Sequence, residues 1–484
     1  MNSNPHHSRR WAILVLLGIA QLMVVLDATI VNIALPSAQK ALHFSDDNRQ
    51  WIVTAYALAF GSLLLFGGRV GDLFGRKVTF VAGLIGFAVA SAIGGLAESF
   101  GVLVVARALQ GAFGALLAPA ALSLLTTTFT NPDERGRAFG IYGAIAGGGG
   151  AVGLLLGGVL TEYLSWRWSL YVNLAFAIPA AIGALALLVN QTHAANSRID
   201  LPGTLTASGG LFALVYGFSN AETHSWGAPT TIGFLVAGVA LLAAFVAIQR
   251  RAAHPLLPLR VVLDRNRGGS YLAVGIVGAG MFGVFLFLTY YLQQTLGFSP
   301  VKTGLAFLPM IGVLMVTATT ATTRLLARTG PRPLLTLGML LAAAGMVLLA
   351  QLDVDSTYAA HVLPGLLVIG AGLGLVMAPA MSSATLGVDA ADAGVASATV
   401  NTMQQIGGSM GTALLSTLAA SAATSFAAGK APSAALAAQA AVHGYVTAFW
   451  WSAGIFAVGA IVCGLLLRGG APAVQPSAEP VLVH

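Results

Sequence analysis

One carboxylate, Asp27, interrupts the apolar run VVLDATIVNIALP at residues 24–36. A charged side chain at the centre of a membrane helix costs about 2.5–3.5 kcal/mol on insertion scales, and intramembrane acids usually face a bundle interior or a watery cavity. Arg107, in LVVARALQG, is the other charge that we place within an apolar span. Arginine stays protonated, but its distance from Asp27 would set how readily that carboxylate binds a proton. Asp27 and Arg107 are therefore either a proton-coupling pair or a static ion pair between the first and fourth spans.

A second candidate is the turn GRVGDLFGRK at 68–77, between the second and third spans. Its glycines permit a tight turn and close helix approach. We expect Asp72 to rest against the amino terminus of a helix in the other half of the chain, where the helix dipole favours negative charge. Such a contact would form a conformational latch present in one conformer only, unless the basic residues merely set topology. The latch residues are Arg69, Asp72 and Arg76, with Asp133 and Glu134 as expected partners of Arg76.

Polar groups within otherwise apolar spans predict either a wet substrate cavity between the halves or hydrogen bonds between helices. They are Asn32, Tyr56, Gln110, Tyr290, Gln294, Asn401 and Gln405. Glu162, at the outer end of the fifth span, is expected to act in substrate release or in packing.

Glycine is concentrated at 143–160, in GAIAGGGGAVGLLLGGVL. Glycine lets helix backbones approach closely and weakens a helix enough for it to bend. We expect a packing and hinge surface at Gly149, Gly153, Gly157 and Gly158, with packing alone as the alternative.

The composition is that of a polytopic membrane protein, because 57% of the 484 residues are hydrophobic and only 8% are charged. Apolar runs of about 20 residues, the length that crosses hydrocarbon as a helix, recur along the chain. The first continues past Asp27 without a small-residue cleavage site, so we expect no removed signal peptide. We predict fourteen spans, near 11–35, 51–70, 78–97, 101–128, 138–161, 168–190, 202–218, 231–248, 270–294, 303–323, 334–351, 361–384, 394–420 and 446–467.

An internal repeat divides the chain. QGAFGALLAPAALS at 110–123 recurs as GAGLGLVMAPAMSS at 370–383, and GRVGDLFGRK at 68–77 has a worn counterpart in TRLLARTGPR at 323–332. Parallel repeats of this kind place a substrate site near the midplane, between the halves. The expected parts are a six-helix half (1–195), two inserted helices (196–250), a cytoplasmic linker (251–268), a second six-helix half (269–470) and a flexible tail (471–484).

The net charge of +7 reflects membrane topology. Most basic residues fall in segments on one face, and positive charge inside places both termini in the cytoplasm. We therefore expect no nucleic-acid partner. No spacing of the nine histidines suggests a metal site, and Cys463 is the single cysteine. The sequence has no nucleophile–base constellation and no GxxxxGK[ST] phosphate loop, so we expect neither an enzyme nor ATP-driven transport.

These motifs together resemble the major facilitator superfamily, specifically its fourteen-span drug:proton antiporter branch. LDATIVNIALP at 26–36 is similar to the first-helix signature of that branch, and GRVGDLFGRK to the loop motif of the superfamily. RALQG at 107–111 is similar to the fourth-helix arginine motif, and 394–415 to the late-helix signature. The sequence departs from the fifth-helix antiporter motif at Leu154, where a proline is expected.

The resemblance implies an all-α rocker-switch exporter in which Asp27 and Arg107 take part in proton coupling and Asp72 holds one conformer closed. We expect export of amphiphilic, antibiotic-like compounds across the cytoplasmic (inner) membrane, with the proton gradient as energy source and no cofactor. The expected partners are membrane lipid, protons and the substrate, for a monomer. The alternatives are transport of a small native metabolite and a membrane sensor or scaffold that carries no flux.

Overall fold

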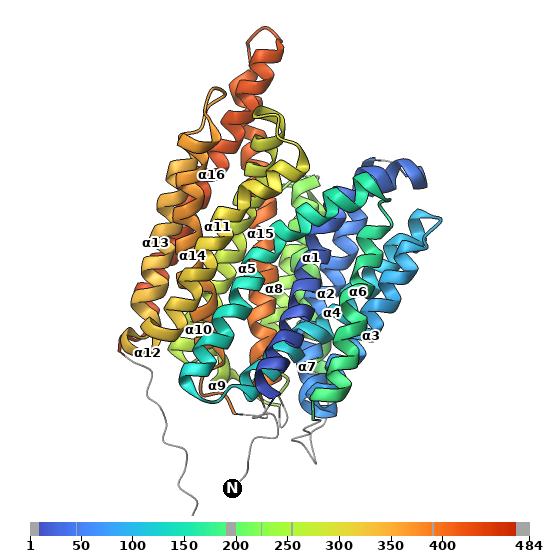
Figure 1. The fold of residues 1–484 in the computed structure, drawn as a ribbon, viewed down its shortest axis with the longest axis vertical. Coiled ribbons are helices and arrows are strands. Elements are labelled where there is room, and N and C mark those ends of the chain that lie inside the picture. The colour runs from blue at the N-terminus through green and yellow to red at the C-terminus, as the bar shows by residue number, and fades with distance from the viewer. Residues whose placement is uncertain are drawn as a thin grey trace, which may run out of the picture.

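The computed structural model describes residues 9–44, 46–189, 200–223, 225–252, 255–389 and 392–470, which form a bundle of long helices with no strand among them (Figure 1). Thirteen helices in this part of the chain are long and apolar enough to cross a membrane. Helix α5 is the fourteenth if its two parts, which meet at a 45° bend, count as one span. The predicted all-α membrane architecture is confirmed.

The first half contains six helices: α1 (Arg10–Leu42), α2 (Asp46–Phe74), α3 (Arg76–Gly95), α4 (Phe100–Thr128), α5 (Pro132–Tyr163) and α6 (Trp168–Leu187). The inserted pair and the linker contain α7 (Leu201–Thr223), α8 (Pro229–Gln249) and the short α9 (Leu259–Val262). The second half contains α10 (Arg265–Tyr290), α11 (Pro300–Thr320), α12 (Leu326–Thr329), α13 (Pro331–Leu349), α14 (Leu363–Thr385), α15 (Ala393–Ala427) and α16 (Ala434–Leu466). Three π-helical turns adjoin these helices: η2 (Tyr291–Thr295), η3 (Ala321–Leu325) and η4 (Tyr358–Val362). The expected boundary regions 190–199 and 471–484 lie outside the described residues.

The repeat seen in the sequence has a backbone counterpart. Gly75, just before α3, and Gly330, just before α13, both have positive φ, at 97° and 75°. This region is open to glycine without steric cost, so both halves turn between their second and third long helices in the same way. Pro119 and Pro379, aligned by the repeat, lie inside α4 and α14.

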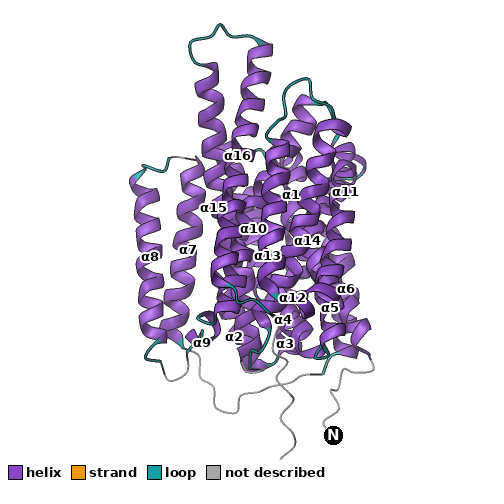
Figure 2. Cartoon of the chain, turned by 90° about the vertical axis from the view of Figure 1, so that its left-hand side faces the viewer, coloured by secondary structure: helices purple, strands orange, loops and turns teal. Residues whose placement is uncertain are grey.

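The last two helices of the second half, α15 and α16, are longer than predicted. α16 begins at Ala434, twelve residues before the predicted span, and Ser433 caps it by accepting a hydrogen bond from the Leu436 N–H. The added segment is rich in alanine, the strongest helix former. α15 and α16 consequently extend beyond the rest of the bundle (Figures 1 and 2).

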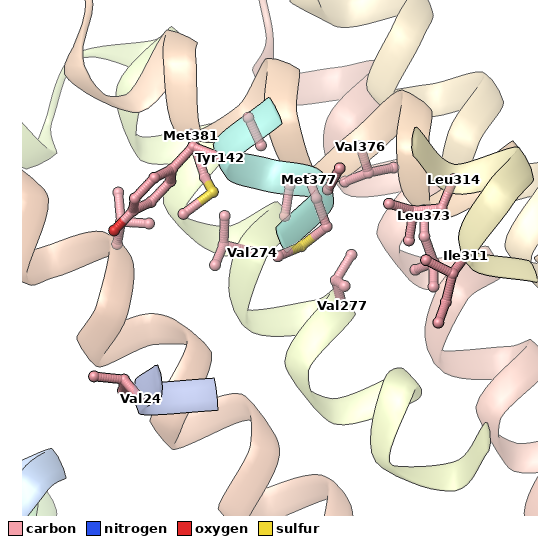
Figure 3. Packing of buried hydrophobic residues seen from close by; sticks show 14 of the residues in the cluster. Val24, Tyr142, Val274, Val277, Ile311, Leu314, Leu373, Val376, Met377 and Met381 are labelled. Atoms are coloured by element: carbon pink, nitrogen blue, oxygen red, sulfur yellow. The ribbon is translucent and has the colours of Figure 1, made fainter. Parts of the chain in front are cut away.

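The two halves share one hydrophobic core. Tyr142 of α5 lies near Met381 of α14, whose neighbour Met377 packs toward Val274 and Val277 of α10 (Figure 3). α5 packs along α11 and α14, while α2 packs along α15. These two seams are where the halves meet.

The inserted pair α7–α8 stands to one side of the bundle (Figure 2). A separate buried cluster joins it to both halves, since it contains Leu65 of α2, Leu211 of α7, Leu256 of the linker and Val395 of α15. The inserted helices therefore pack against the α2–α15 seam.

The start of α1 and the end of α16 lie at the same end of the bundle, at the bottom of Figure 1, where α9 also lies. We call this the basic end, because Arg69, Arg76, Arg135 and Arg260 gather there.

Candidate functional site

Asp27 of α1 and Arg107 of α4 form a buried ion pair, with Arg107 Nη1 2.6 Å from Asp27 Oδ2. Asp27 is 0% exposed and Arg107 1%. A buried pair is stable only when further hydrogen bonds satisfy its remaining polar atoms. The predicted partners are thus in direct contact.

Two amides complete the surroundings of the carboxylate. Asp27 Oδ1 accepts hydrogen bonds from Gln110 Nε2 (3.0 Å) and from Asn173 Nδ2 of α6 (2.6 Å). Both amides also donate to the Ser91 hydroxyl of α3, at 2.7 Å and 3.1 Å. The cluster lies within the first half, and every donor suits an ionised carboxylate.

For Gln110 the structure shows the second of the two expected alternatives, hydrogen bonds to other helices, rather than a place in the cavity lining. Its side chain is fully buried in this cluster and also accepts a hydrogen bond from Arg107 Nη1 at 2.8 Å. Gln110 lies one helical turn from Arg107, so both side chains share one face of α4. Sequence reasoning did not single out Ser91 and Asn173, although an amide in the apolar run 168–190 was a usable signal.

Arg107 has two further contacts, both with α2. Its Nε donates to the Ile52 carbonyl at 3.3 Å, and its Cζ lies 4.4 Å from the centre of the Tyr56 ring. The ring of Tyr56 stacks in turn on Phe60, with centres 5.6 Å apart and an interplanar angle of 9°. An aromatic face attracts a cation most strongly where water is excluded.

A cavity of about 210 Å³ lies between the halves. Helices α1, α2, α4 and α5 of the first half and α10 and α15 of the second contribute to it. No charged side chain is among the described residues that line it. The lining residues are Gln21, Val24, Val25, Ala28, Thr29, Tyr56, Phe60, Ala118, Ala146, Gly150, Met281, Phe285, Asn401, Gln404 and Gln405.

Three of the predicted cavity residues line this space: Tyr56, Asn401 and Gln405. Gln21, Thr29 and Gln404 were not anticipated. Gln21 accepts a hydrogen bond from the Tyr142 hydroxyl at 2.7 Å, which ties α1 to α5 beside the cavity.

Two others, Tyr290 and Gln294, contact a neighbouring helix instead, which is the alternative to a place in the cavity. Gln294 accepts a hydrogen bond from the Tyr445 hydroxyl at 2.9 Å, and the Tyr290 ring centre is 6.3 Å from that of Tyr445. Tyr290 ends α10 and Gln294 lies in η2, so both belong to a contact with α16 within the second half. The Asn32 side chain lies outside the described residues.

At the basic end, Asp72 of α2 meets the amino terminus of α15. Its Oδ1 accepts from the Gly394 N–H at 3.0 Å and its Oδ2 from the Val395 N–H at 3.3 Å. This is the helix contact expected from the sequence. Arg76 Nη2 lies 3.6 Å from Asp72 Oδ1, and the buried Arg69 acts electrostatically on the same carboxylate. The conformational role of the contact stays a prediction.

The expected pairing of Arg76 with Glu134 is not what the structure shows. Glu134 instead forms an ion pair with Arg10 of α1, at 2.6 Å. Asp133 is exposed in the first turn of α5, where acids favour the helix dipole. Within the described residues, the acid beside Arg76 is Asp72, four positions earlier in the chain.

Arg135, which the sequence analysis did not single out, makes a second contact between the halves. This buried side chain of α5 donates from Nη2 to the Thr385 hydroxyl at 2.8 Å and to the Ser382 carbonyl at 3.3 Å, both on α14. Its guanidinium also lies 4.6 Å from the centre of the Phe139 ring. Arg135 therefore closes the α5–α14 seam where Asp72 closes the α2–α15 seam.

A third set of charges joins the linker to the same region. Arg260 of α9 lies 2.5 Å from Asp392 and 3.4 Å from Asp389. Burial raises the pKa of the Asp392 carboxyl, and the charge of Arg260 opposes that shift. Asp392 directly precedes α15, so the linker is tied to the helix end that Asp72 contacts.

The glycines of α5 form two packing faces. A Cβ at Gly149, Gly153 or Gly157 would meet Val25, Thr29 or Ile30 of α1, and Gly158 is buried. The glycines facing the second half come earlier in α5: Gly136, Gly140, Gly143 and Gly148.

The 45° bend of α5 separates Asp133–Gly150 from Leu155–Tyr163. Gly153 thus lies at the bend, and the other three predicted positions flank it. Glu162 is exposed near the end of the helix. Within the described residues, no group of three histidine, cysteine or acidic side chains is arranged to hold a metal.

Comparison with known sequences identifies the family. Residues 17–412 match the model of the Major Facilitator Superfamily. The chain is 51% identical to the puromycin resistance protein of Streptomyces alboniger, over 95% of this chain and 92% of that protein. It is 40% identical to the cephamycin export protein of Amycolatopsis lactamdurans, over 84% and 85%. It is also 36% identical to the lincomycin resistance protein of Streptomyces lincolnensis, over 84% and 83%.

Solved structures show the same fold. The proton:xylose symporter XylE aligns over 94% of this chain and 95% of its own with a TM-score of 0.64 at 13% identity. The human organic anion transporter MFSD10 aligns with a TM-score of 0.62 at 15% identity, over 94% and 99%. These likenesses establish the architecture.

Proposed function

Because the chain belongs to the major facilitator superfamily, we propose that it is a proton-coupled antiporter that exports amphiphilic, antibiotic-like compounds by alternating access. The observation that carries this proposal is the buried Asp27–Arg107 pair beside a cavity built from both halves. Charged residues within membrane spans pair with one another and mark proton relays or substrate pathways in transporters.

Proton binding at Asp27 would require the cluster to rearrange. The two carboxylate oxygens accept from Arg107, Gln110 and Asn173. A protonated carboxyl group becomes a donor at one oxygen and would oppose one of these donors. Uptake of a proton is thus linked to movement of a side chain contributed by another helix.

The basic end is the cytoplasmic end in this proposal, because basic loops stay inside, and both termini are cytoplasmic. The conformer described here is closed there by Asp72 and Arg135. Separating these contacts would open the cavity to the cytoplasm. Alternation between the two arrangements is rigid-body rocking of the halves.

The cavity suits uncharged, amphiphilic surfaces, since its lining combines amides with aromatic and aliphatic groups. Its volume is below the roughly 300–1,000 Å³ of sites for drug-sized ligands, so substrate entry requires the halves to part. Puromycin is the first compound to test, because a protein 51% identical confers resistance to it. The proton gradient supplies the energy without a cofactor, and the monomer in the inner membrane is the working unit.

Everted membrane vesicles test this proposal directly. With an imposed acidic interior, vesicles containing the protein should accumulate radiolabelled puromycin, and nigericin, which collapses the pH gradient, should release it. Vesicles lacking the protein are the control. Accumulation that is indifferent to the gradient would contradict proton-coupled export.

A further inference from the structure

Tyr56 lies between the cavity and the buried ion pair. Its side chain lines the cavity, while the face of its ring lies 4.4 Å from Arg107 Cζ. The residue is 5% exposed. The cavity and the Asp27 cluster are thus separated by one aromatic ring.

The Tyr56 ring can stabilise the Arg107 guanidinium when Asp27 is neutral. Protonation removes the negative charge that holds Nη1 at 2.6 Å. The contacts that remain are the Ile52 carbonyl, Gln110 Oε1 and the Tyr56 face. An aromatic face stabilises a cation without water, so Tyr56 favours the state in which Arg107 has released the carboxylate.

The ring, rather than the hydroxyl group, makes these contacts. The Tyr56 hydroxyl is buried and has no hydrogen-bond partner among the described residues. Phe60 stacks on Tyr56 and also lines the cavity. A ligand that packs against these two rings would change the position of the ring beneath Arg107.

We infer that Tyr56 is the positioning residue through which substrate in the cavity and the proton on Asp27 are coupled, and that the substrates it serves are amphiphiles bearing an aromatic ring. This inference rests on the proposed antiport function. It makes the coupling indirect: substrate and proton occupy different places and communicate through the orientation of one ring. By linkage, the ring transmits the effect equally in both directions.

The test counts protons released when puromycin binds to the purified protein in weakly buffered detergent solution, together with the dissociation constant. The proton count equals the slope of the logarithm of that constant against pH. Asp27→Asn gives the contribution of the amine of puromycin itself. Tyr56→Leu removes the ring. If the leucine variant does not fold, Tyr56→Met is used in its place.

Tyr56→Leu should still bind puromycin, but its proton count should fall until it differs from the Asp27→Asn count by no more than about a fifth. Tyr56→Phe should keep the wild-type count, because the hydroxyl has no partner. The matched control is Phe285→Leu, which alters the cavity wall contributed by α10, where the ring packs on Phe307, and which should weaken binding several-fold without changing the count.

A wild-type count in Tyr56→Leu or Tyr56→Met, or a lost count in a folded Tyr56→Phe, would overturn the inference. A wild-type protein that releases no more protons than Asp27→Asn would instead contradict the proposed antiport function, and the inference with it.

Discussion

The Asp72 carboxylate of α2 accepts the backbone N–H groups of Gly394 and Val395 at the start of α15, at 3.0 Å and 3.3 Å. The two helices belong to different halves of the chain. A negative group at a helix amino terminus satisfies unpaired N–H groups and complements the helix dipole. The contact exists only while α2 and α15 are together at the basic end, so it favours the conformer closed there.

Asp72→Ala should make the basic end open more readily. Loss of a helix cap costs about 0.5–2 kcal/mol, which corresponds to a change of about 2-fold to 30-fold in the ratio of open to closed protein. The measurement is the labelling rate of a cysteine at Ala398, which is buried against Gly68, in a Cys463→Ser background. Asp133→Ala, an exposed acid at the same end, is the control. Equal labelling rates in the Asp72 and Asp133 variants would argue against a latch.

Arg135 and Thr385 should behave as a coupled pair in a double-mutant cycle. Their side chains are in contact across the second seam, and contacting residues show interaction energies of about 0.5–3 kcal/mol. Arg135→Gln and Thr385→Val should each lower the apparent unfolding temperature, and the double variant should lose less than the sum. Arg137→Gln, on the same helix, should be additive with Thr385→Val. Additivity in both cycles would contradict the assignment of Arg135 as a residue that closes the α5–α14 seam.

Asn173→Ala should destabilise the protein although the residue does not line the cavity. The substitution removes a 2.6 Å donor from a buried carboxylate, and an unsatisfied buried group costs about 1–3 kcal/mol, more when charged. Thermal unfolding followed by size-exclusion chromatography measures this. Asn401→Ala, which removes a bond within α15 to Ser397, is the control and should have the smaller effect. If both variants unfold alike, Asn173 has no special role at Asp27.

The sequence located the charges better than their neighbours. Asp27 and Arg107 could be paired in advance because they were the two charges placed within spans. Gln110, three residues after Arg107, shares its helix face, and the cluster rather than the cavity could have been expected from that spacing. Asn173 and Ser91 reach Asp27 only through the packing of α3 and α6, which no local pattern specifies.

Glycine spacing shows the same limit. The run in α5 predicted close packing, but it contains two faces, one against α1 and one against the second half. Which face meets which helix depends on the 45° bend and on the order of the helices. For Tyr290 and Gln294 the sequence could not choose between the two alternatives, since a polar group in an apolar span pairs as readily with a neighbouring helix as with a cavity.

The most direct measurement of the account as a whole is puromycin transport by proteoliposomes under an imposed pH gradient, with wild type beside Asp27→Asn. The variant keeps the shape of the side chain and removes its charge and its proton. Since an unpaired buried Arg107 costs about 3–5 kcal/mol, puromycin binding is measured first to show that the variant is folded. Glu98→Gln, an exposed acid in the loop between α3 and α4, is the control.

Asp27→Asn should bind puromycin, yet its rate of gradient-driven transport should fall at least about tenfold, whereas Glu98→Gln should transport as wild type. Gradient-driven transport at the wild-type rate in Asp27→Asn would contradict the assignment of Asp27 as the proton carrier.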